Sequence, residues 1–200
     1  MSPQNLKDIK KDIYLSMHKA QEMVDLAEDG FMKGRLSSLN QAHELAIEIH
    51  TKDDVLVAAL ANIASGTREA KYLLSVPSHI ESIASSIIRI IEGIRTRIKE
   101  GLLFSDRAML ELQRLFTTAK HALKKAGEAA VTGAKTTIQD VLGESDALGR
   151  MTNEFATAHE ERLVTGECPP KSSSTYLSML YAFEEMSAHI KHAAIKLSCK

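Results

Sequence analysis

An apolar side chain returns every three or four residues along positions 73–94, and this spacing constrains the fold more than any other feature of the chain. A repeat of this kind places the side chains on one stripe of an α-helix, whereas a half-buried β-strand needs a period of two. Such a stripe is a seam along which the helix packs against other helices. The seam consists of Leu73, Val76, Ile80, Ile83, Ile87, Ile90 and Ile94.

Similar periodicity, interrupted by helix-breaking residues, continues through the rest of the chain. The 200 residues include only ten glycines and four prolines, and good helix formers dominate the composition. Pro77 lies inside the seam and predicts a kink or a helix start near 77, because it cannot donate to the preceding turn. Ser105 is a predicted N-cap. We therefore predict an all-α fold with six helical segments at about 4–33, 36–64, 68–100, 106–131, 134–165 and 172–198.

The charge pattern argues against two kinds of partner. The net charge is −1, and no basic stretch is long enough to follow a phosphate backbone, so nucleic-acid binding is not expected. No apolar run reaches about 18 residues, so no membrane-spanning helix is expected. The polar N-terminus does not resemble a signal peptide, and two cysteines are too few for a disulfide framework. We expect a free-standing cytoplasmic protein that meets a membrane only through its partners.

The two halves of the chain resemble each other. When residues 73–94 are shifted by 103 positions, they fall on residues 176–197, and all seven seam positions are apolar or aromatic in both copies. Glu81 also falls on Glu184. One interpretation is coincidence, because two amphipathic helices can often be slid into register. The alternative is an internal repeat with halves at about 1–103 and 104–200, which predicts two pseudo-repeated three-helix bundles packed side by side.

Several local stretches resemble the PhoU family, whose members regulate phosphate uptake in bacteria. "HEERLVTGECPP" at 159–170 and the helix that follows it are similar to the family's closing stretch. That family helix carries a Leu-Glu-Arg-Ile-Gly-Asp-His core, which corresponds here to residues 183–189. "SHIESIASSIIRIIE" at 78–92 resembles the same core in the first half, and "EGLLFSDRAMLELQRLF" at 100–116 resembles the link into the fourth helix.

The resemblance implies a metal motif in each half, in which an acid is followed four residues later by Asp. Residues four apart lie on one helical face, so two carboxylates can hold one cation. Here Glu81 is followed by Ser85, and Glu184 is followed by Ala188, so the second acid is absent in both copies. His79 stands where a further acid can precede the core. The resemblance therefore supports the fold better than it supports a metal site.

The last helical segment offers a second candidate metal face. Glu185, His189 and His192 have spacings of four and three residues, so they share one side of the helix. They suit either a three-ligand metal face or a solvated flank. No cofactor is firmly implied, and a divalent or iron-type ion is the candidate. The metal ligands predicted from both observations are Glu81, Glu184, Glu185 and His189.

Other polar pairs carry a plainer interpretation. The acids Glu44 and Glu48 suit a wet helical face, and His43 and His50 suit boundary positions on the same helix. His159, in the HEERL stretch, is expected to cap or pack rather than to perform chemistry.

Catalytic signatures are missing from the sequence: no Gly-rich phosphate loop follows a strand, and no H-E-x-x-H occurs. The resemblance instead implies a non-enzymatic regulator of phosphate uptake. It would act through protein contacts with a phosphate transporter or its sensor kinase, and it would form a homodimer as the family often does. A metal-binding or metal-sensing bundle and an unrelated helical adaptor are the alternatives.

Overall fold

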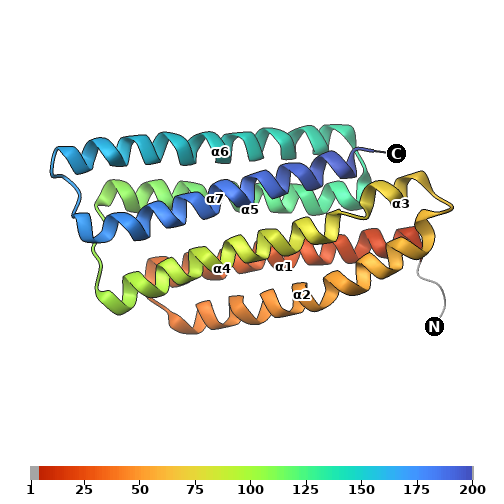
Figure 1. The fold of residues 1–200 in the computed structure, drawn as a ribbon, viewed down its shortest axis with the longest axis horizontal. Helices are drawn as coiled ribbons and strands as arrows, with labels where there is room; N and C mark the ends of the chain where they lie inside the picture. The colour runs from red at the N-terminus through yellow and green to blue at the C-terminus, as the bar shows by residue number, and fades with distance from the viewer. Residues whose placement is uncertain (1–4, 200) are drawn as a thin grey trace.

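The fold is described for residues 5–199 by a computed structural model. Within this range the chain forms seven helices (Figure 1). They are α1 (Leu6–Lys33), α2 (Leu36–Ala64), α3 (Arg68–Leu73), α4 (Val76–Glu100), α5 (Asp106–Thr132), α6 (Lys135–Val164) and α7 (Pro170–Leu197). The all-α prediction is confirmed. The predicted start of the first helix, residue 4, lies outside the described residues.

The predicted third segment is two helices, because α3 ends before α4 begins. Pro77 occupies the first turn of α4, where the missing N–H has no intrahelical partner to lose. The helix start expected near Pro77 is therefore confirmed. The predicted cap is also present, because the Ser105 hydroxyl accepts a hydrogen bond from the Ala108 N–H at 3.3 Å. The last helix begins at Pro170, two residues earlier than predicted, since proline is well suited to a first turn.

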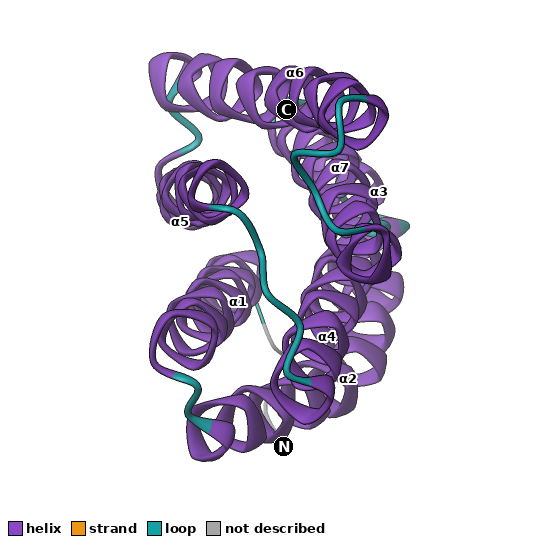
Figure 2. Cartoon of the chain, turned by 90° about the vertical axis from the view of Figure 1, so that its left-hand side faces the viewer, coloured by secondary structure: helices purple, strands orange, loops and turns teal. Residues whose placement is uncertain are grey.

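The helices form two three-helix bundles that lie side by side. α1, α2 and α4 pack together in the first half, and α5, α6 and α7 pack together in the second. Figure 2 shows the bundles end-on, with α2 and α6 outermost and the other long helices between them. The bundles meet where α4 packs on α7 and α1 packs on α5. This arrangement agrees with the predicted architecture, whereas the descent of both halves from one ancestral unit stays a prediction.

Both predicted seams are buried. Every seam position from Leu73 to Ile94 and from Tyr176 to Leu197 belongs to the hydrophobic core. Aromatic rings also join the bundles, because Phe116 of α5 packs on Phe31 of α1 and edge-on against Phe183 of α7. Gly93 lets α4 approach α7 closely, since a Cβ there would lie 2.7 Å from Cγ of Met179. Among the described residues, no helix is both long enough and apolar enough to cross a membrane.

Candidate functional site

The four predicted metal ligands lie on two helices, and two of the three acids among them already have partners. Glu81 on α4 faces His50 of α2, with 3.4 Å between Oε1 and Nδ1. Glu185 on α7 forms an ion pair with Arg89 of α4 across the junction of the two bundles. Glu184 and His189 also lie on α7. The structure therefore divides these residues among different neighbours.

Within residues 5–199, one group of three His, Cys, Asp or Glu side chains brings its potential ligand atoms within 4.8 Å of one another. This group consists of His79, His189 and His192, which we call the three-histidine cluster. Of the four predicted ligands, only His189 belongs to it. Metal binding by Glu81, Glu184 and Glu185 stays a prediction.

The three-histidine cluster spans the junction between α4 and α7. Nδ1 of His79 lies 3.3 Å from Nδ1 of His189, although the two residues are 110 positions apart in the chain. The ring of His79 also lies 5.5 Å from that of His192, centroid to centroid. His79 and His189 are half-buried, and His192 is exposed to solvent. Solvent can therefore reach the cluster from one side.

Burial and like charge favour the neutral imidazoles at this junction. Burial lowers the pKa of His79, and the neighbouring His189, His192 and Lys196 lower it further. Burial also lowers the pKa of His189, with smaller contributions from His192 and Arg89. Both rings are therefore neutral at pH 7, which is the form in which histidine binds a metal ion.

A second polar group lies between α2 and α4 in the first half. Glu81 and His50 line a shallow groove there together with Ser85. Asp53 of α2 lies nearby, and burial, then the Glu81 carboxylate, raises the pKa of Asp53. Its Oδ1 is buried without a hydrogen-bond partner. The sequence interpretation missed Asp53 because one of many acids on an amphipathic helix gives no distinguishing signal.

The second half contains a buried polar network that the sequence interpretation did not predict. Arg162 of α6 donates two hydrogen bonds to the carboxylate of Glu111 on α5, at 2.9 and 2.8 Å. The Tyr176 hydroxyl donates to the same carboxylate at 2.5 Å. Burial and this carboxylate raise the pKa of Tyr176 above its ordinary value. The network joins all three helices of the second bundle.

His159 extends this network, so the packing role expected of it is confirmed. Its ring lies against Tyr176 with centroids 4.7 Å apart, and Nε2 lies 2.7 Å from Oγ of Ser173. Burial, and then the charge of Arg162, lower the pKa of His159. Its Nδ1 is buried without a hydrogen-bond partner, so a proton there would have no acceptor.

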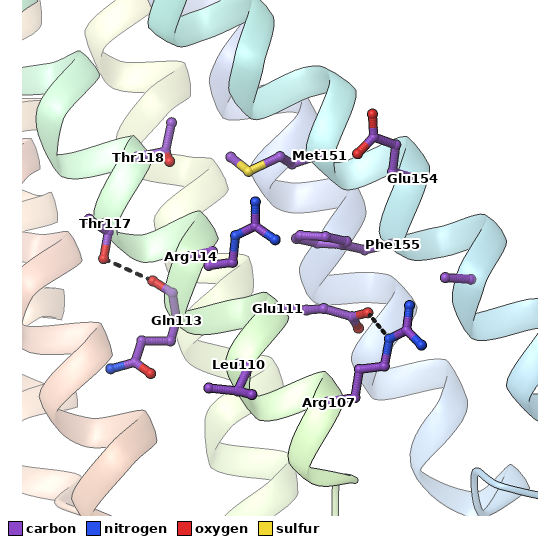
Figure 3. Close-up of a pocket in the computed structure, with 11 residues that line it drawn as sticks. Arg107, Leu110, Glu111, Gln113, Arg114, Thr117, Thr118, Met151, Glu154 and Phe155 are labelled. Carbon is purple, nitrogen blue, oxygen red and sulfur yellow. Dashed lines mark hydrogen bonds and ion pairs between the residues drawn. The ribbon is translucent and has the colours of Figure 1, made fainter.

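A groove between α5 and α6 is lined in part by Glu111 of this network (Figure 3). Arg107 reaches Glu111 from this groove at 3.3 Å, and Arg114 lies over the ring of Phe155 at 5.5 Å. The lining residues include no histidine or cysteine, and the carboxylate of Glu111 is fully engaged. Charged and apolar side chains therefore both line this groove.

Acid should destabilise the second bundle through His159. The stability that the neutral His159 ring contributes is fully present above the ordinary histidine pKa of about 6.5. It is lost as the pH falls through the lower pKa that His159 has in the folded protein. We expect the free energy of unfolding of wild type to fall between pH 7 and pH 5 more steeply than that of His159→Gln, as measured by urea denaturation. His121→Gln changes an exposed histidine and serves as the control, so its stability should fall with pH as that of wild type does. Equal slopes for wild type and His159→Gln would contradict this account.

Comparison with known protein families and with curated proteins gives no match. Solved structures do match. The chain superposes on PhoU from Pseudomonas aeruginosa with a TM-score of 0.83, covering 96% of this chain and 94% of that one at 14% sequence identity. The chain has the PhoU fold.

A second solved structure agrees. A putative PhoU-like phosphate regulatory protein from Shewanella oneidensis MR-1 matches with a TM-score of 0.62, covering 99% of this chain and 96% of that chain at 12% identity. The PhoU resemblance noted in the sequence is thereby confirmed for the fold. Identities this low leave the activity, partners and ligands of this chain open to proposal.

Proposed function

We propose that this protein is a non-enzymatic regulator of phosphate uptake. The observation that carries the proposal is the PhoU fold over nearly the whole chain, with a TM-score of 0.83 to PhoU from Pseudomonas aeruginosa. The second matching structure is that of a putative PhoU-like phosphate regulatory protein. The local PhoU-like stretches in the sequence also support the proposal.

The regulator acts through protein contacts at the cytoplasmic side of a phosphate transporter, or on the sensor kinase that serves it. Helices of 25–30 residues present faces about 40 Å long, which is sufficient for docking on another protein. The groove between α5 and α6 adds a surface with both charged and apolar side chains, including the exposed Leu110. A homodimer forms part of the proposal and can be tested by light scattering of the purified protein.

Affinity purification from the native cell tests the choice of partner. The protein would carry a small tag at its chromosomal locus, and detergent-solubilised membranes would be prepared from cells grown at high and at low phosphate. We expect enrichment of phosphate-transporter subunits or of their sensor kinase. Enrichment of unrelated proteins alone, under both growth conditions, would instead favour the general helical adaptor.

A further inference from the structure

We propose that His79, His189 and His192 form a binding site for one divalent transition-metal ion of the Zn²⁺ type. This site differs from the acidic pairs implied by the family resemblance, because it uses three imidazoles and joins the two bundles. It also extends the proposed function, because regulation through protein contacts requires no metal.

The positions of the ring nitrogens suit a tetrahedral ion. Zn–N bonds of about 2.0–2.1 Å place neighbouring ligand nitrogens about 3.3 Å apart. The Nδ1 atoms of His79 and His189 are 3.3 Å apart, and all three ligand atoms lie within 4.8 Å of one another. Bringing all three nitrogens to this spacing requires side-chain movement. His192 is exposed, so its ring is free to rotate toward the other two.

The ligand set selects the class of ion. Neutral imidazole suits zinc, copper, nickel and iron, whereas magnesium and calcium prefer carboxylate and carbonyl oxygens. The cluster offers nitrogen ligands without a thiolate, which disfavours soft Cu⁺. Three protein ligands leave a fourth position for water, on the side where His192 meets solvent.

Charges around the cluster moderate the affinity without preventing binding. Arg89 and Lys196 lie near the imidazoles and oppose a further positive charge. However, Arg89 is paired with the carboxylate of Glu185, which cancels much of its field.

The two halves of the chain differ at this place, which predicts a single ion per chain. The 103-residue shift that aligns the halves places His79 on Ala182, His189 on Ser86 and His192 on Arg89. In the structure Arg89 donates a hydrogen bond to Ser86 and pairs with Glu185. The position equivalent to the cluster thus holds an arginine instead of metal ligands. A metal bound through the acidic pairs would instead occur twice.

An ion at the cluster would link the bundles. His79 belongs to α4 of the first bundle, and the other two ligands belong to α7 of the second. The bound ion would therefore act as a clamp between elements that otherwise meet through apolar packing and the Arg89–Glu185 pair. Because the unfolded chain lacks the assembled site, binding should also raise the melting temperature.

Titration of the purified full chain with Zn²⁺ and Co²⁺ tests the proposal. The protein would carry no polyhistidine tag and would first be treated with chelator. We expect one equivalent of Zn²⁺ by calorimetry, a rise in melting temperature of roughly 5–10 °C at saturation, and visible absorption bands of tetrahedral Co²⁺. His192→Ala and His79→Ala should each weaken binding at least about tenfold.

Two controls make the result interpretable. His121→Ala removes an exposed histidine of α5 and should bind as wild type does. His192→Ala changes an exposed side chain, so its fold should persist, as circular dichroism of the metal-free protein can verify. The proposal is overturned if wild type binds no Zn²⁺ at micromolar concentrations, or if binding survives in His79→Ala and His192→Ala. Two equivalents that disappear in Glu81→Gln and Glu184→Gln would overturn it in favour of the acidic pairs.

Discussion

Glu111→Ala is expected to lower the free energy of unfolding by about 3–5 kcal/mol, because it breaks a buried ion pair. Glu111 is 5% exposed and accepts hydrogen bonds from Arg162 and Tyr176. Its removal leaves the guanidinium of Arg162 buried without a counter-charge and the Tyr176 hydroxyl without an acceptor. Urea denaturation followed by circular dichroism measures the loss.

Two variants separate the buried network from general effects of charge. Glu154→Ala removes an exposed carboxylate from the rim of the same groove and should change stability by less than about 0.5 kcal/mol. Replacing Glu111 with Leu and Arg162 with Met together removes both charges, and should recover much of the loss. A cost below about 1 kcal/mol for Glu111→Ala would show that the network contributes little.

Phe183→Ala is expected to cost a similar amount, about 3–5 kcal/mol, through loss of buried apolar contacts. The Phe183 side chain is fully buried, and its ring packs edge-on against Phe116 with centroids 5.1 Å apart. Phe116 also packs on Phe31 of α1, so this contact adjoins the junction of the two bundles. The cavity left by truncation cannot close without moving α5 toward α7. Thermal and urea unfolding would both report the loss.

Tyr181→Ala is the matched control for Phe183→Ala. It removes an aromatic ring from the same helix, two residues away, at a side chain that is 56% exposed. Its effect should stay within about 0.5 kcal/mol. If both variants lost the same stability, burial of the Phe183 ring would not explain the loss.

The fold was predictable from sequence because apolar periodicity records burial directly. The seam from Leu73 to Ile94 and its second copy are buried at every position. Pro77 and Ser105 also marked helix starts, since each has a specific role in a first helical turn. The packing of α4 on α7 and of α1 on α5 has no comparable local signature, because it depends on residues about 100 positions apart.

The three-histidine cluster could be predicted only in part from sequence patterns. Spacing placed Glu185, His189 and His192 on one face of the last helix. The structure turns Glu185 to Arg89 and brings His79 from the other bundle to the two histidines. The presence of His79 in place of Glu185 in this group could not be predicted from a single helix, because it depends on how the bundles meet.

Glu111 and Arg162 were missed for a different physical reason. The chain contains 26 acidic and 25 basic residues, nearly all of which a helix can expose to water. A buried charged residue cannot be told from an exposed one in the sequence, and the partner of Glu111 lies 51 residues away. His159 gave a clearer signal in the sequence, because its place in the HEERL stretch suggested packing. The structure confirms this role.

Phosphate uptake in a deletion strain tests the proposed regulatory function most directly. Initial uptake rates of radiolabelled phosphate would be measured after growth at high and at low phosphate, in wild type, in the deletion strain and in the complemented strain. We expect the deletion to change uptake under at least one condition and the intact gene to restore it. Unchanged uptake at both phosphate levels would contradict the proposal that this PhoU-fold protein regulates phosphate transport.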